Sequence, residues 1–267
     1  MTSDSNQTSA TPIPRDSWYR ELVIHFNDGN EEHFYIELTQ TGTHIPRPLT
    51  EPAPWTRLSH YKCACCPLGT NIRYCPAAES LETTLLRLQD HYSTEQVKAR
   101  AVDGASRETI ISRSLQEVGT AFVHLAVFSS GCPIGREFRP MLSDLRPFST
   151  NEELSRHIVT KMLLKHRGRL EQSRQQILAM LEPLREVFAK LCKRLPVNSK
   201  GDAMANSIIS MDAAALAIVL EIDQALENLA TEMGWGDTAT PRPVETLSAL
   251  PPTSLWARLK ARFTRKG

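Results

Sequence analysis

The sequence lacks the two features that would direct a chain out of the cytosol. No run of about 18 apolar residues is present, so no transmembrane helix is expected. The closest candidate, Ala213–Leu220, is short and is followed by Glu221. The first residues, Met1–Thr11, are polar and lack the basic start and apolar centre of a signal peptide. We therefore expect a cytoplasmic protein whose thiols stay reduced.

Catalytic motifs are also missing. The chain contains no His-Glu-x-x-His, no Gly-x-Ser-x-Gly, no P-loop and no Gly-x-Gly-x-x-Gly. The histidines are scattered, and His124 follows a helical apolar pattern that is typical of a core histidine. A nucleophilic role for Cys132 would need a positioned base, and no histidine is identified for it. Whether the protein is an enzyme therefore stays open.

What is present describes an ordinary globular protein, with 41% hydrophobic and 23% charged residues. The net charge of +1 is unevenly divided. From Thr240 onward six basic residues oppose one acid, which is +5 and leaves −4 on the rest. An acidic body argues against nucleic-acid binding and places any anionic partner at the basic tail.

The pattern of the first half predicts a small antiparallel sheet made of two hairpins, because alternating apolar residues flank two Asp-Gly turns. A helix with Leu81, Leu85 and Leu88 on one face separates the hairpins. The predicted strands and helix are Trp18–Phe26, Glu32–Leu38, Ala78–His91, Val97–Val102 and Thr109–Ser112.

The second half predicts helices. A helical pattern covers Ser114–Ser130, and Gly131 stands where a helix C-cap is expected. A capping box, Ser149 with Glu152 or Thr150 with Glu153, opens a helix that runs through Leu164. Two more helices are expected over Leu170–Leu195, bent or restarted at Pro183, and over Asp202–Met233.

These elements predict an α+β fold, a small antiparallel sheet of two hairpins plus a larger helical subdomain. The expected organisation is a disordered N-terminus over 1–15 and a single domain over 16–235. Within that domain, 16–112 holds the sheet and the cysteine loop, and 113–235 the helical part. A proline-rich linker over 236–253 and a basic amphipathic helix over 254–267 follow.

Four cysteines form the most specific pattern in the chain. Cys63 and Cys66 have the two-residue spacing that suits chelation, and Cys75 and Cys132 complete a set of four ligands. Cys65 is the odd thiol of this segment and an alternative ligand, and His60 is also within reach of the same ion. Cys192 has the pattern of core packing.

The spacing does not choose the metal. Cys-Pro, found at Cys66, Cys75 and Cys132, occurs in ferredoxin-type runs and also in zinc knuckles. Zinc and an iron–sulfur cluster both stay open, as does a set of buried or redox-active thiols without metal. In either metal case the ion or cluster would fasten the cysteine loop to the helical part, and its binding energy would appear as folding energy.

Two polar groups in the last long helix also need partners. Asp212 lies on an apolar stripe, where an unpaired charge would be costly, so we expect an ion pair with Arg156 or Arg139 rather than a catalytic role. Asp202 and Asn206 lie one turn apart, and we expect them to cap the helix or pair with the preceding loop.

At the cysteines the sequence resembles an uncharacterised bacterial family classed as a domain of unknown function. The similarity covers about Tyr19–Leu229 and leaves out the tail. It supports the cysteine set and implies no activity. Leu145 departs from the family pattern, which often has a histidine there. The matching residues are Cys63, Cys66-Pro67-Leu68, Cys75-Pro76, Ser130–Pro133, Arg139–Met141, Pro147-Phe148, Glu152-Glu153, Asp202-Ala203, Asn206 and Asp212.

The tail predicts a short helix with one apolar face and basic flanks, formed by Leu255, Trp256, Leu259 and Phe263. Such a helix binds an anionic membrane surface or docks on a partner protein or on its own domain. The first option would place the protein peripherally on the inner face of the membrane.

Two functions fit these features. The first is a non-enzymatic, metal-stapled adaptor or sensor with a membrane-tethering tail. The alternative is an iron–sulfur or thiol-based redox protein or enzyme of unknown substrate.

Overall fold

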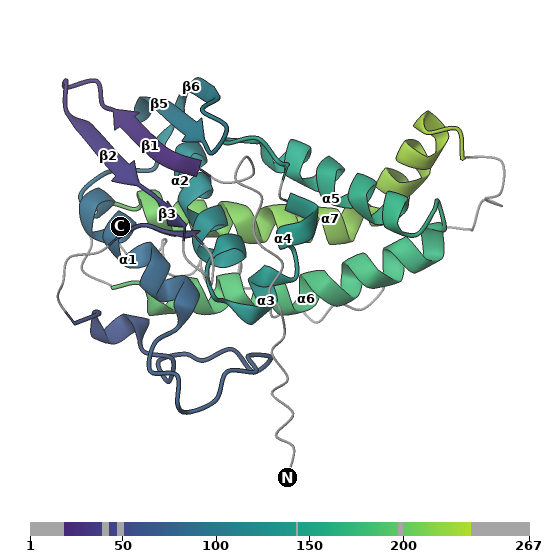
Figure 1. Cartoon of the computed structure of the whole chain (residues 1–267), viewed down its shortest axis with the longest axis horizontal. Coiled ribbons are helices and arrows are strands. Elements are labelled where there is room, and N and C mark those ends of the chain that lie inside the picture. The colour runs from purple at the N-terminus through teal and green to yellow at the C-terminus, as the bar shows by residue number, and fades with distance from the viewer. Residues whose placement is uncertain (1–18, 39–42, 47–50, 143, 197–199, 236–267) are drawn as a thin grey trace, which may run out of the picture.

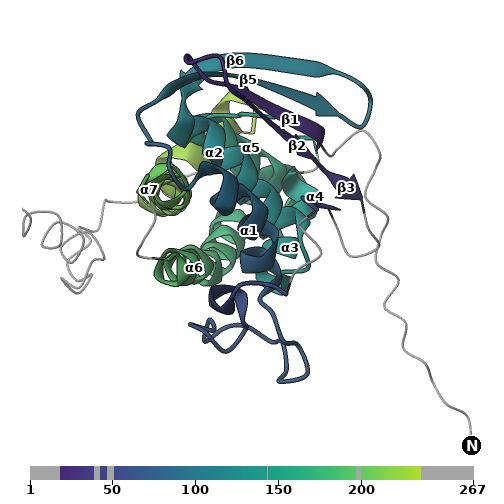
Figure 2. The same cartoon turned by 90° about the vertical axis from the view of Figure 1, so that its left-hand side faces the viewer.

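A four-stranded antiparallel sheet forms one layer of the molecule, with helices on one of its faces (Figures 1 and 2). The computed structural model describes residues 19–38, 43–46, 51–142, 144–196 and 200–235. The strand order is β2-β1-β5-β6, so the two predicted hairpins lie side by side and the α+β prediction is confirmed. The strands are β1 (Tyr19–His25), β2 (Glu31–Tyr35), β5 (Gln96–Asp103) and β6 (Glu108–Ser114).

The two hairpin turns are built differently. In the first, Gly29 adopts a left-handed backbone with φ 89°, as the Asp-Gly pattern predicts. In the second, Ser106 and not Gly104 has the positive φ, 64°. The Asp103 carboxylate stabilises this turn by accepting hydrogen bonds from the N–H groups of Ala105 and Arg107, both at 2.9 Å.

The predicted strand Glu32–Leu38 is too long. It breaks at Ile36, whose buried side chain packs in the core. Beyond that point β3 (Glu37–Leu38) leaves the main sheet and pairs with β4 (Thr43–His44) in a separate two-stranded ladder.

One hydrophobic core joins the sheet to the helices. The inner face of the sheet buries Leu22, Ile24 and Phe34 in the same cluster as Phe122 and Phe188 from two different helices. The helical segments are η1 (Pro54–Thr56), α1 (Pro76–Leu88), α2 (Leu115–His124), η2 (Leu125–Ser129), α3 (Pro133–Arg136), α4 (Arg139–Leu142), α5 (Asn151–Lys165), α6 (Leu170–Arg194) and α7 (Ala203–Glu232).

Several predicted helix ends can now be compared with the structure. The capping box that opens α5 is Thr150 with Glu153, one of the two predicted. A restart at Pro183 is wrong, because α6 is one helix from Leu170 to Arg194. The predicted helix end before Gly131 agrees with the structure, since η2 continues α2 to Ser129 with Ser130 as its C-cap, but Gly131 does not adopt the left-handed backbone of a glycine cap.

Among the described helices, α7 is long and apolar enough to cross a membrane by length and composition alone, with a mean hydropathy of 1.7 over 18 residues. In the fold it packs against α2, α5 and α6. Its apolar side chains, such as Ile208, Met211 and Ile218, belong to the core cluster. In the described structure 44% of this apolar stretch is buried, so packing in the interior accounts for part of its composition.

The predicted N-terminal segment 1–15, linker 236–253 and amphipathic helix 254–267 lie outside the described residues.

Candidate metal centre

The four predicted cysteines, Cys63, Cys66, Cys75 and Cys132, line one pocket. They come from three places in the chain: the segment 51–75, the start of α1 and the start of α3. Figures 1 and 2 show the segment 59–72, which follows η1, as a coil at the lower end of the molecule. The structure therefore brings together residues that are as many as 69 positions apart.

Two of these cysteines occupy equivalent positions at the start of a helix. Cys75 is the N-cap of α1 and Cys132 the N-cap of α3, and each is followed by a proline in the first helical turn. Both have an extended backbone with ψ 117°, the conformation that a following proline favours. The two N-caps are neighbours in space, because a Cβ added to Gly131, just before Cys132, would lie 3.4 Å from the ring of Pro76, just after Cys75.

The other two cysteines form a turn that is held by α6. The Cys66 N–H donates to the Cys63 carbonyl at 3.1 Å. Glu186 of α6 accepts hydrogen bonds from the N–H groups of Ala64 (2.7 Å) and Cys65 (3.3 Å). Although burial alone would raise it, these N–H donors hold the pKa of Glu186 below its usual value. Glu186 therefore acts as a fixed anionic cap on the turn.

The pocket lies between apolar side chains that include Leu58, Ile134 and Leu191. Burial, and next the neighbouring Cys75, raise the pKa of the Cys63 thiol to about 12. Burial is also the main cause that raises the pKa of Cys132 to about 11. Without a cation these thiols are neutral at pH 7, so Cys132 is not an activated nucleophile.

The pocket that the four cysteines line together with other side chains is small, about 20 Å³. A cavity needs roughly 10–15 Å³ to hold one water molecule, so the pocket has room for a group of about that size. Within the described part of the chain, no three His, Cys, Asp or Glu side chains are arranged so that they could hold a metal ion. The four cysteines share the pocket but are not disposed as a closed coordination shell.

The other predicted ligands lie outside this pocket. The Cys65 sulfur points to the Pro183 carbonyl of α6 at 3.8 Å. His60 is exposed, and its ring contacts that of Tyr61. Cys192 is half-buried and packs against the core, and its burial raises its pKa to about 12.

Asp212 forms the predicted ion pair, but its partner is Arg185 of α6 at 3.2 Å. The two arginines named from the sequence are engaged elsewhere: Arg156 pairs with Glu232, and Arg139 donates to the carbonyls that end η2. Burial raises the pKa of Asp212 in spite of the pair. Arg185 is the partner because α6 and α7 lie side by side in the fold.

Asp202 and Asn206 bind a loop, although not the one that precedes them in sequence. Asp202 accepts from the Ser93 N–H at 2.7 Å, and the Asn206 amide donates to the Ser93 hydroxyl at 2.9 Å. They connect α7 to the segment between α1 and β5 and have a structural role there.

His124 lies at the end of α2, next to a second small cavity lined by Thr120, Arg146 and Ser149. Its Nε2 is buried without a hydrogen-bond partner in the described structure. Burial, with a smaller contribution from His157, lowers the pKa of His124 to about 4.

Sequence reasoning missed three residues of α6 that surround the cysteines: Glu186, Lys190 and Arg194. They are spaced by four, so they share one face of the helix with Val187 and Leu191. This charged and apolar face is visible in the sequence, but nothing there indicates that it faces the cysteines.

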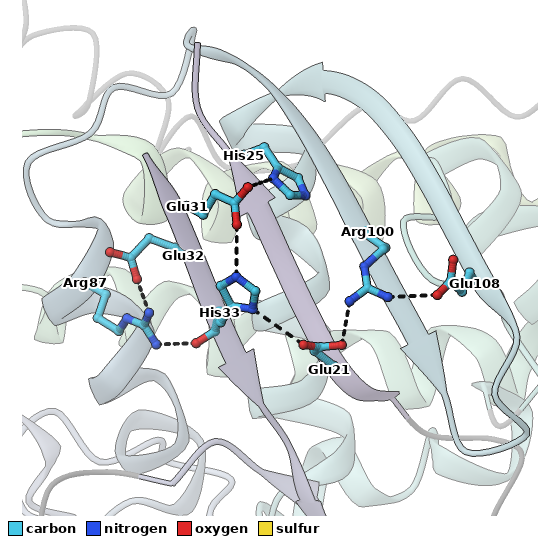
Figure 3. Close-up of polar contacts among 8 residues, drawn as sticks. All are labelled: Glu21, His25, Glu31, Glu32, His33, Arg87, Arg100 and Glu108. Carbon is cyan, nitrogen blue, oxygen red and sulfur yellow. Dashed lines mark hydrogen bonds and ion pairs between the residues drawn. The ribbon is translucent and has the colours of Figure 1, made fainter. Parts of the chain in front are cut away.

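A second group of titratable side chains crosses the outer face of the sheet, as Figure 3 shows. Its contacts measure 2.7–3.5 Å and join neighbouring strands through His25, Glu31, His33, Glu21, Arg100 and Glu108. Hydrogen bonds from His33 and His25 lower the pKa of Glu31. Ion pairs on an exposed surface contribute little to stability, so we assign them to the sheet surface and not to a site.

Fold and site together define an α+β domain with a cysteine-lined pocket between its loop and helical parts. The chain belongs to the family described as Domain of unknown function (DUF6901), whose model matches residues 20–233. Comparisons with curated proteins and with solved structures found no match. The family resemblance seen in the sequence is confirmed. The family-wide cysteine pattern and the bacterial origin stay predictions.

Proposed function

We propose that this protein is a non-enzymatic, zinc-stapled adaptor or sensor, in which Cys63, Cys66, Cys75 and Cys132 bind one ion. The observation that carries the proposal is the convergence of these four cysteines, from three segments, on one pocket. Zinc takes four thiolates in tetrahedral sites, and four protein ligands leave no open position for a substrate. The centre would therefore be structural.

The number of thiols is compatible with a single zinc ion, because four thiolates fill its tetrahedral shell. Four thiolates also hold an iron–sulfur cluster, so metal analysis is needed to distinguish the two. The positions of Cys75 and Cys132 also favour a structural metal site, since each is the N-cap of a helix and is followed by a proline.

Metal analysis of protein purified without oxygen tests the proposal. We expect one zinc per chain in the wild type, and loss of zinc in Cys75→Ser and Cys132→Ser. Cys65→Ser and Cys192→Ser are matched controls, because they remove a nearby thiol that does not line the pocket, and they should keep the ion. A wild type with less than a tenth of an equivalent of any metal would refute the centre. A brown protein that contains iron and sulfide would instead support the alternative function, an iron–sulfur redox protein.

The adaptor role depends on the tail, which lies outside the described residues. The proposal there is that Leu255, Trp256, Leu259 and Phe263 bind an anionic membrane surface. Sedimentation with vesicles that contain anionic lipid, with and without residues 254–267, is the test. Equal pelleting of the two proteins would eliminate lipid tethering and favour a protein partner.

A further inference from the structure

The strand β6 forms one edge of the main sheet (Figure 2). Among the described strands it pairs with β5 alone, in a register that is unbroken over all seven of its residues. Natural edge strands avoid pairing with other chains by being very short, by forming bulges, or by carrying lysine or proline. β6 has none of these features, and the threonine and two isoleucines at its centre favour the strand conformation. This edge is therefore suited to accept another strand.

The opposite edge of the sheet, β2, is closed by a side chain. The Phe26 N–H donates to the Asn30 carbonyl at 2.9 Å, so in this register the even-numbered residues of β2 bond to β1. The His33 carbonyl therefore faces outward, and Arg87 of α1 donates to it and also pairs with Glu32, as Figure 3 shows. Among the described residues no side chain binds the backbone of β6 in this way.

Two backbone hydrogen bonds show which groups of β6 face outward. The Leu115 N–H donates to the Glu95 carbonyl at 2.7 Å, and the Asp103 N–H donates to the Arg107 carbonyl at 3.0 Å. Bonded pairs alternate along an antiparallel ladder, so in this register the odd-numbered residues of β6 bond to β5. The residues whose N–H and C=O groups face outward, without a backbone partner in the described structure, are Glu108, Ile110 and Ser112.

We infer that β6 pairs antiparallel with β6 of a second copy of this chain, which joins the two sheets into one across a two-fold axis. The register that places Ile110 opposite its own copy also places Glu108 opposite Ser112. All three residues with outward groups then exchange hydrogen bonds.

Other registers of this pairing are less favourable. A shift by two residues in one direction would place Ser112 opposite Ser106, which lies in the turn and has φ 64°. A shift in the other direction would place Glu108 opposite Ser114, whose N–H already donates to the Glu117 carboxylate at 3.2 Å. The strand ends therefore select the register that is centred on Ile110.

Side chains on the outer face favour a second copy as the partner. Ile110 is 54% exposed, and its own copy would cover it with an apolar side chain. Lys98 of β5 lies opposite the small Ser112, is exposed, and has no ion-pair partner among the described residues. Two strand spacings are about 10 Å, so Lys98 could reach across Ser112 to Glu108 of the other copy. The two-fold axis forms this pair of opposite charges twice.

The interface is small. Pairing of one strand from each copy buries less than the area of a standard protein interface, about 1,600 Å². We therefore expect a dimer that dissociates on dilution. The contact does not involve the cysteines, so this inference goes beyond the proposed function and is tested separately from it.

Sedimentation of the full chain from low micromolar to near-millimolar concentration tests the inference. We expect the average mass to rise from one chain towards two. Ile110→Glu places two carboxylates opposite each other in the dimer, whereas its neighbour on β5 in the monomer is Arg100, so association should weaken about tenfold or more. Lys98→Glu should weaken it by a smaller factor. Leu220→Glu, an equivalent change at an exposed position of α7, is the control that should associate like the wild type.

A cross-link tests the register. The Cα atoms of a hydrogen-bonded antiparallel pair lie about 5.5 Å apart, a distance that a disulfide spans. Mild oxidation of Ile110→Cys should therefore give a covalent dimer. Ser112→Cys is the control, because Ser112 lies opposite Glu108 and its thiol would meet no other, and oxidised wild type reports the native thiols.

Three results would overturn the inference. The first is a wild type that stays monomeric over the whole concentration range. The second is an Ile110→Glu variant that is folded by circular dichroism and associates like the wild type. The third is equal cross-linking of Ile110→Cys and Ser112→Cys, which would exclude the register centred on Ile110.

Discussion

The short helix α3, which carries Cys132 at its start, is held by a close backbone contact that predicts a specific effect of substitution. A Cβ added to Gly135 would lie 1.8 Å from the carbonyl oxygen of Val127 and 2.6 Å from its carbonyl carbon. Normal C···O contacts are about 3.3 Å or longer, so Gly135→Ala must move α3 away from η2 by about 1.5 Å. The obstacle is backbone, so no rotamer change can relieve it.

The energetic cost follows from this displacement. Overpacking in a core destabilises typically by about 1–3 kcal/mol, and a backbone clash belongs at the upper end. Alanine gains about 1 kcal/mol over glycine in a helix, which leaves a net loss of about 2 kcal/mol. For a chain of this size that lowers the melting temperature by roughly 4–8 °C. Cys132 would move with α3, so the proposed function predicts that zinc affinity should fall as well.

Gly131 supplies the matched control, because it lies just before Cys132. Its added Cβ would meet the Pro76 ring at 3.4 Å, an ordinary van der Waals contact. We therefore expect Gly131→Ala to leave the melting temperature within about 2 °C of the wild type. Thermal unfolding followed by circular dichroism compares the two variants. Equal melting temperatures for Gly135→Ala and Gly131→Ala would refute the reasoning.

Three further predictions concern buried polar groups. His124→Phe removes an unpaired nitrogen and should stabilise the fold by about 1 kcal/mol at pH 7. Because the folded pKa of His124, about 4, lies below the unfolded value of 6.5, the wild type loses stability as pH falls through this window, and the variant should lose less in urea titrations. Arg185→Met should cost about 1 kcal/mol by leaving Asp212 unpaired, since the arginine is partly exposed to water, and adding Asp212→Asn should recover most of this loss; additive losses would contradict the pairing. Asp103→Ala should cost about 2 kcal/mol at pH 7 by freeing N–H groups of the β5–β6 turn. Burial alone would raise the pKa of Asp103, but hydrogen bonds and the ion pair with Arg107 lower it below its usual value. The difference in stability between wild type and variant should therefore shrink as the pH falls through this pKa. A difference that does not depend on pH would argue against the ion pair.

The elements that the sequence predicts well are those specified by local chemistry. Alternation and Asp-Gly turns identify both hairpins, and a single side-chain motif identifies the start of α5 at Thr150. The four cysteines could be selected because their spacing distinguishes Cys63 and Cys66 from Cys65. That selection agrees with the pocket that they line.

The errors come from tertiary packing. Asp212 has Arg185 as its partner because α6 lies beside α7, and no local pattern encodes that neighbour. In the same way, Glu186 and Arg194 meet the cysteine loop from more than 120 positions away. The alternation also continues through Ile36, but Glu37 and Leu38 pair with Thr43 and His44 instead of continuing the main sheet.

The cysteine loop shows why an ion is physically reasonable at this place. Its base is closed by the bridge between Arg57 and Tyr74 and by the Leu58 N–H, which donates to the Arg73 carbonyl. The residues between, 59–72, contain no helix or strand, and ordering each residue costs about 1–2 kcal/mol. Their apolar burial is small, since Tyr61 and Ile72 are exposed. Hydrogen bonds with Arg194 hold the first residues of the loop, and hydrogen bonds with Glu186 hold Ala64 and Cys65. The zinc ion of the proposed function would add a further cross-link to this loop.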